Sequence, residues 1–186
     1  MLLRRTFLAG SSAIVVAAPA RAIERRGDPA PLPPGYIAMG QRHGVPPLLL
    51  YGVALQESKD LFGEQSLPHP WTLCVRGKPL RFSTQAVAVH HLQHCVAAGV
   101  TNVDCGLMQV NWRYHQRRLQ SFARALDPYS NIAVGAGILR EHFDATGDWF
   151  EAVGRYHHPS NTSRANAYAR SVFARLPRIP RGRTHA

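Results

Sequence analysis

A nearly unbroken apolar stretch from Leu48 to Leu55 is followed, two residues later, by the carboxylic acid of Glu57. Pro46 and Pro47 stand directly before this stretch and suit the start of a helix. The apolar pattern therefore predicts a buried helix over residues 47–56 that delivers Glu57 to apolar surroundings. Because burial disfavours the charged form of a carboxyl group, we expect an acid here that holds its proton near neutral pH.

Helix signals recur through the rest of the chain. In the longest regular pattern, Ile132, Ala136, Leu139 and Phe143 follow one another at spacings of 4, 3 and 4, which places them on one helix face. Capping residues and glycines suggest where the other helices begin and end. Helices are expected over residues 36–43, 47–56, 84–98, 112–126, 128–146, 148–156 and 162–176, the last with Tyr168 facing inward.

One segment has the alternation of a β-hairpin. Residues 71–75 alternate, residues 76–79 provide a turn, and residues 80–82 return. Residues 67–70 are expected to form a loop. The fold class predicted from these patterns is α+β, mostly α-helical, with one small hairpin.

The first residues read as an export signal. Arg4 and Arg5 form a basic start, residues 7–18 are an apolar run, and Ala20-Arg21-Ala22 supplies a cleavage site. We expect cleavage after Ala22 and a periplasmic or otherwise exported protein. The general secretory and the twin-arginine routes both stay open, as does an uncleaved anchor.

The remaining chain is long enough for one compact domain. Residues 23–35 carry four prolines and read as an extended leader, residues 36–176 form the domain, and residues 177–186 read as a basic flexible tail. The formal net charge is +11, and removal of residues 1–22 would lower it by three. A basic exported protein is attracted to anionic wall polymers, membrane surfaces or nucleic acid, and charge alone does not choose among them.

The chain has three cysteines, Cys74, Cys95 and Cys105. An oxidising compartment would permit one disulfide, between Cys95 and Cys105 or between Cys74 and Cys105. Three free thiols are the alternative.

Several motifs in order resemble one family. Glu57-Ser58, the run Gly106-Leu107-Met108-Gln109 and the stretch from Ala152 to Tyr156 are similar to the ordered motifs of soluble lytic transglycosylases, which have a lysozyme-like fold. Asp127-Pro128 and Asn131-Ile132 resemble the helix between the second and third motifs. The likeness covers residues 36–176. The hairpin and helix of residues 71–98 also resemble an insertion in members that accompany conjugation and type IV secretion systems.

The resemblance implies an enzyme that cleaves peptidoglycan between N-acetylmuramic acid and N-acetylglucosamine, with no cofactor and no metal. Glu57 would be the catalytic acid and then the base, and the product would carry a 1,6-anhydro ring. Substrate-binding roles would fall to Ser58, Met108, Gln109, Asn111 and Tyr156. Among these, the Tyr156 hydroxyl is expected to hydrogen-bond Glu57. His157 stands where the family often has Asn, which leaves its role open.

Three other functions are weighed. Hydrolysis by a muramidase would need a second carboxylate, for which Asp60, Glu64 and Asp104 are the candidates. A metal-binding module could use His90 with His94, or His91 with Cys95, at helical spacing. A nucleic-acid-binding accessory of conjugation would use the arginines, although no recognition motif supports it.

Overall fold

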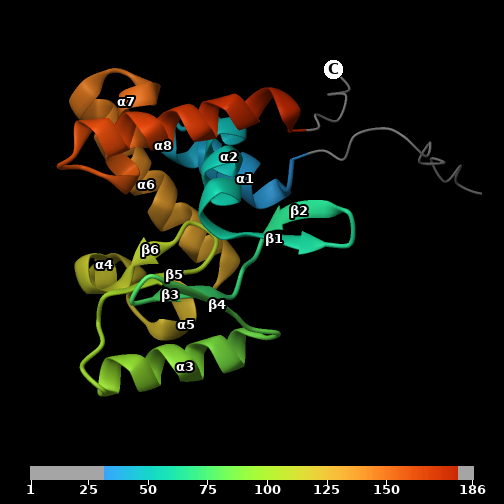
Figure 1. Cartoon of the computed structure of the whole chain (residues 1–186), viewed down its shortest axis with the longest axis vertical. Coiled ribbons are helices and arrows are strands. Elements are labelled where there is room, and N and C mark those ends of the chain that lie inside the picture. Colours follow the sequence, from blue (N-terminus) through green and yellow to red (C-terminus); the bar gives the residue numbers. More distant parts are fainter. Residues whose placement is uncertain (1–31, 180–186) are drawn as a thin grey trace, which may run out of the picture.

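The computed structural model describes residues 32–179. The expected signal peptide, most of the leader and residues 180–186 of the expected tail lie outside this range. Within it, the chain is mostly helical with two small antiparallel sheets (Figure 1), which confirms the α+β class. No helix between residues 32 and 179 combines the length and apolar character needed to cross a membrane.

Side chains at the helix starts explain most of the helix boundaries. Thr84, Asp127 and Asp148 each accept a hydrogen bond from a backbone N–H three residues on, so the expected caps are confirmed. The last long helix is capped by Asn161, and not by Thr162 or Ser163 as expected. The helices are α1 (Pro34–His43), α2 (Pro47–Ser58), α3 (Gln85–Ala97), α4 (Trp112–Leu119), α5 (Phe122–Ala125), α6 (Pro128–Thr146), α7 (Trp149–His157) and α8 (Thr162–Arg175).

Two expected helical or flexible stretches differ in the structure. The helix predicted over residues 112–126 is divided into α4 and α5, because Gln120 has a left-handed backbone (φ 65°) and Ser121 caps the second piece. Residues 176–178, partly assigned to the tail, form a 3₁₀ helix, and the Ile179 side chain is buried. At the other end, α1 begins at Pro34, inside the segment expected to be an extended leader.

The strands form two separate sheets. The predicted hairpin is confirmed as β3 (Thr72–Val75) and β4 (Lys78–Arg81). A second hairpin, β1 (Lys59–Phe62) with β2 (Gln65–Pro68), occupies part of the expected loop. The short strands β5 (Val103–Cys105) and β6 (Val110–Asn111) complete a four-stranded sheet in the order β4-β3-β5-β6.

Helix α2 lies at the centre of the fold. It is buried along most of its length, as the apolar run predicted, and it packs against α1, α8 and β2. Figure 1 shows α2 among the helices α1, α6 and α8, with the four-stranded sheet between this group and α3. The carboxyl end of α2 therefore meets the sheet region, and Glu57 lies there.

Candidate active site

The Glu57 side chain is held at the end of α2 by two elements far away in sequence. Only 10% of its surface is exposed. The Tyr168 hydroxyl, from α8, donates a hydrogen bond of 2.5 Å to Glu57 Oε1. His157 Nδ1, at the end of α7, lies 3.5 Å from the same oxygen. The carboxyl group is thus shielded and oriented from one side.

The close approach of α7 and α8 places these two partners together. A β-carbon at Gly154 would lie 2.9 Å from the backbone oxygen of Ala165, so only glycine permits this contact. The His157 ring stacks on the Tyr168 ring with 4.4 Å between centroids and an interplanar angle of 16°. The residues that contact Glu57 therefore also support one another.

Burial and the carboxylates set the charge state of the neighbours. The hydrogen bond to Glu57 raises the pKa of His157 above its ordinary value, against the opposing effect of burial. Burial, reinforced by the charge of Glu57, raises the pKa of the Tyr168 phenol, so it stays protonated and acts as a donor. The pKa of Asp104 is raised mainly by burial and also by the charge of Glu57.

The loop between β5 and β6, residues 106–109, runs beside Glu57 and is fixed by three side chains. The Ser58 hydroxyl donates to the Leu107 carbonyl at 2.8 Å. The Tyr156 hydroxyl donates to the Met108 carbonyl at 2.7 Å. Asn131, fully buried on α6, accepts from the Met108 N–H at 2.8 Å and donates to the carbonyls of Cys105 and Ala125.

Three of the residues expected to bind substrate make internal contacts in the structure. The Ser58 hydroxyl is buried and lies within hydrogen-bond distance of the Ala54 and Leu107 carbonyls, so its expected role at the substrate stays a prediction. The Met108 side chain has no exposed surface and packs over Gly135 of α6. The expected bond from Tyr156 to Glu57 is wrong, because that hydroxyl is committed to Met108 and the donor is Tyr168. Leu107 is buried.

Gln109 and Asn111 are both part of the framework around the loop. Gln109 has a left-handed backbone (φ 45°), and its Nε2 donates to the carbonyls of Gly106 and Thr72. Asn111 Nδ2 donates to Asp104 at 2.7 Å and to Asn102, while its buried Oδ1 has no partner in the described part of the chain. Sugar contact by either side chain stays a prediction.

The alternative ligands and carboxylates are scattered. Asp60 pairs with Arg81 at 3.4 Å, and Glu64 lies exposed in the turn between β1 and β2, so only Asp104 is electrostatically coupled to Glu57. Across residues 32–179, no group of three or more His, Cys, Asp or Glu side chains could hold a metal. All three cysteines are free thiols.

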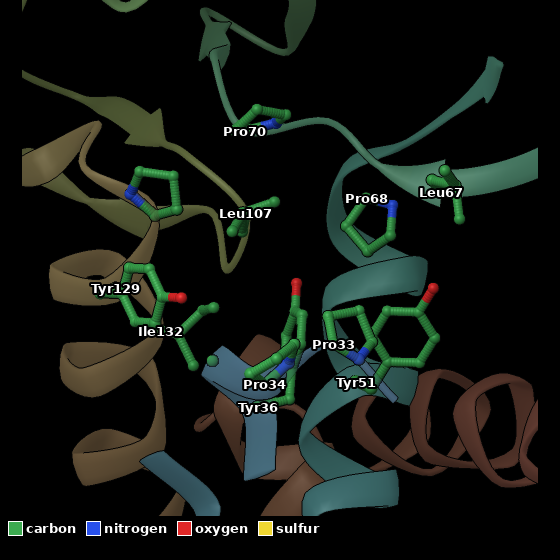
Figure 2. Close-up of a pocket in the computed structure, with 12 residues that line it drawn as sticks. Pro33, Pro34, Tyr36, Tyr51, Leu67, Pro68, Pro70, Leu107, Tyr129 and Ile132 are labelled. Carbon is green, nitrogen blue, oxygen red and sulfur yellow. The ribbon is translucent and has the colours of Figure 1, made fainter. Parts of the chain in front are cut away.

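A separate apolar pocket of about 310 Å³ lies on another side of the loop. Figure 2 shows it between α1, α2, β2 and α6, with the Tyr36 hydroxyl pointing into it. Leu107 belongs to both regions, since its side chain lines the pocket while its carbonyl accepts from Ser58. Glu57 does not line this pocket.

The fold, with the shielded carboxyl group of Glu57 at the end of α2, defines a lysozyme-like α+β domain. Residues 36–172 match the family model described as the transglycosylase SLT domain. The match covers well over half of the chain, so this protein belongs to the SLT family of lytic transglycosylases, whose substrate is peptidoglycan. No curated protein and no solved structure matches it.

Gly106 provides a test of how tightly the loop is held. It has a left-handed backbone (φ 73°), and a β-carbon would lie 2.6 Å from the Asn131 amide. We expect Gly106→Ala to lower the free energy of unfolding by about 3 kcal/mol or more, since backbone strain and overpacking add. Gly99→Ala is the matched control, because Gly99 has a similar backbone (φ 78°) with nothing within 4 Å.

Gly99→Ala should lower the free energy of unfolding by only about 1–2 kcal/mol, because only the backbone strain is added. Denaturant unfolding of both variants measures the difference. Equal losses would show that the Asn131 contact does not constrain the loop.

Proposed function

We propose that this protein is a lytic transglycosylase in which Glu57 acts first as acid and then as base, leaving 1,6-anhydro ends. The observation that carries the proposal is the arrangement at Glu57. Tyr168 and His157 both approach Oε1, and Oε2 makes no hydrogen bond to residues 32–179. Because Tyr168 donates to Oε1, the acidic proton belongs on Oε2, which is then the atom that can meet a glycosidic oxygen.

In the first step Glu57 Oε2 gives its proton to the oxygen between N-acetylmuramic acid and N-acetylglucosamine. The bond from that oxygen to the muramyl C1 breaks, and N-acetylglucosamine leaves with a hydroxyl group. The positive charge that develops at C1 is stabilised by the carbonyl oxygen of the neighbouring acetamido group, as in substrate-assisted glycosidases. The Tyr168 hydroxyl holds the resulting carboxylate in place.

In the second step the carboxylate removes the proton from the muramyl 6-hydroxyl. The O6 atom then bonds to C1 and closes the anhydro ring, and Glu57 regains its proton. The reaction consumes no water and needs no second carboxylate, so Glu57 alone can act in both steps. General acid–base help of this kind is worth roughly 10² to 10⁴ in rate.

Hydrolysis is the second candidate, and Asp104 is the observation that favours it. This carboxyl group is largely buried, and burial and the charge of Glu57 both raise its pKa. It could activate a water molecule in an inverting reaction. However, one of its oxygens already accepts from Asn111 at 2.7 Å, which fits a structural role in the sheet.

Product analysis distinguishes the two reactions. We expect purified sacculi digested by the protein to release muropeptides that resist borohydride reduction and are lighter by one water than their hydrolysed counterparts. Asp104→Asn should keep this product pattern, since it removes only the charge. Reducible muramyl ends would establish hydrolysis and refute the proposed second step.

We further propose an exported, periplasmic location, where peptidoglycan is accessible, after cleavage of residues 1–22. The biological role would be local opening of the wall for an envelope-spanning conjugation or type IV secretion apparatus. The support for that role is the resemblance of residues 71–98, which form β3, β4 and α3.

A further inference from the structure

His157 has a chemical property that a simple framework residue would not need. Its Nδ1 lies 3.5 Å from Glu57 Oε1, and its side chain is 44% exposed, so it can exchange protons with solvent. Its ring stacks on Tyr168, the other group that contacts the same carboxyl oxygen. A protonated imidazole gains from both contacts, because it pairs with a carboxylate and lies over an aromatic face.

We propose that His157 is a positioning residue that shares a proton with Glu57 and thereby sets the upper pH limit of the reaction. The inference rests on the proposed function and deepens it. Glu57 must carry a proton to begin the reaction, whereas a cationic His157 favours the charged form of the Glu57 carboxyl group. The two residues therefore compete for one proton as pH rises.

The protonation of Glu57 and His157 together gives the direction of the pH dependence. At low pH both groups are protonated, and Glu57 can act as an acid. As pH rises, the first proton leaves the pair, and the remaining one is drawn to His157, whose pKa is raised by the hydrogen bond to Glu57. A cation beside a carboxyl group favours the charged form of that group, so a protonated His157 opposes the acid form of Glu57 that the first step needs.

Other charged and titratable groups surround Glu57 and His157. The Asp104 carboxyl group, on β5, acts in the same direction as Glu57 on the pKa of His157. The neighbouring His158 is half-buried, and its pKa is lowered by burial, by His157 and by Arg164. The groups to be considered are Glu57 on α2, Asp104 on β5, Tyr156 on α7, Tyr168 and Arg164 on α8, and His158.

The test is the pH dependence of sacculus digestion by His157→Asn, which stays neutral and can still donate a hydrogen bond. We expect the alkaline limb of the activity profile to move up by about one pH unit, because the competing cation is gone. His158→Asn is the matched control, since its ring touches His157 edge-on but has no hydrogen bond to Glu57. It should leave the limb in place. An unmoved limb in His157→Asn, or an equal shift in the control, would overturn the inference.

A second measurement does not depend on activity. The imidazole of His157 can be titrated by NMR in the unaltered protein and in Glu57→Gln, and its pKa should fall in the variant. If the pKa of His157 does not change, the proton-sharing inference fails while the proposed function stands. If Glu57→Gln digests sacculi normally, the proposed function fails even where the two residues prove to be coupled.

Discussion

Glu57→Gln should abolish most of the peptidoglycan-degrading activity, lowering the rate by a factor of roughly 10² to 10⁴. The amide has nearly the same size and can still accept the Tyr168 hydrogen bond, but it has no proton to give to the glycosidic oxygen. Release of soluble muropeptides from purified sacculi measures the loss. The thermal unfolding midpoint should stay close to that of the unaltered protein, because one side of the carboxyl group already faces a neutral donor.

Glu141→Gln is the matched control for this experiment. Glu141 is exposed on α6 and pairs with Arg118 at 2.8 Å, so the same chemical change occurs away from the site. It should leave digestion unchanged. A folded Glu57→Gln protein that still releases anhydro-muropeptides at the normal rate would disprove the assignment of the acid.

Asn131→Ala should lower the free energy of unfolding by about 3–5 kcal/mol. The Asn131 side chain makes three buried hydrogen bonds, to the N–H of Met108 and to the carbonyls of Cys105 and Ala125. The alanine variant removes all three bonds and opens a small cavity. Urea unfolding followed by far-UV circular dichroism gives the change.

Asn161→Ala makes the same substitution at an exposed helix cap, where Asn161 accepts one bond from the Arg164 N–H. It should cost only about 1 kcal/mol. If the two variants lose similar stability, the Asn131 network contributes little, and another contact must hold the loop. Any loss of digestion in Asn131→Ala should be read at a temperature where the variant is folded.

Local signals made much of the fold predictable. Helix caps such as Thr84 and Asp127 act on residues only three positions away, so the sequence contains both partners. The strands β5 and β6 could not be found in this way. They are three and two residues long, and β5 is defined by its pairing with β3, in which Leu73 lies opposite Cys105. Such distant pairing leaves little trace in a short stretch of sequence.

The position of Glu57 at a buried helix end could be predicted from the sequence, whereas its contacts could not. The apolar run before Glu57 correctly indicated a buried helix end. Tyr168 was recognised as an inward-facing residue, since helical periodicity gives the face, but periodicity does not say which atom meets the hydroxyl. The sequence leaves the role of His157 open, because this residue stands where the family often has Asn. Its contact with Glu57 joins residues 100 positions apart and is visible only in three dimensions.

The loop carbonyls of Leu107 and Met108 accept from side chains on two different helices, Ser58 of α2 and Tyr156 of α7. These two hydrogen bonds connect the helices to the loop of the four-stranded sheet that lies beside Glu57. A hinge motion that parted them would break both bonds and displace Glu57 itself. We therefore expect residues 106–109 and the carboxyl end of α2 to keep their relative position when a ligand binds beside them.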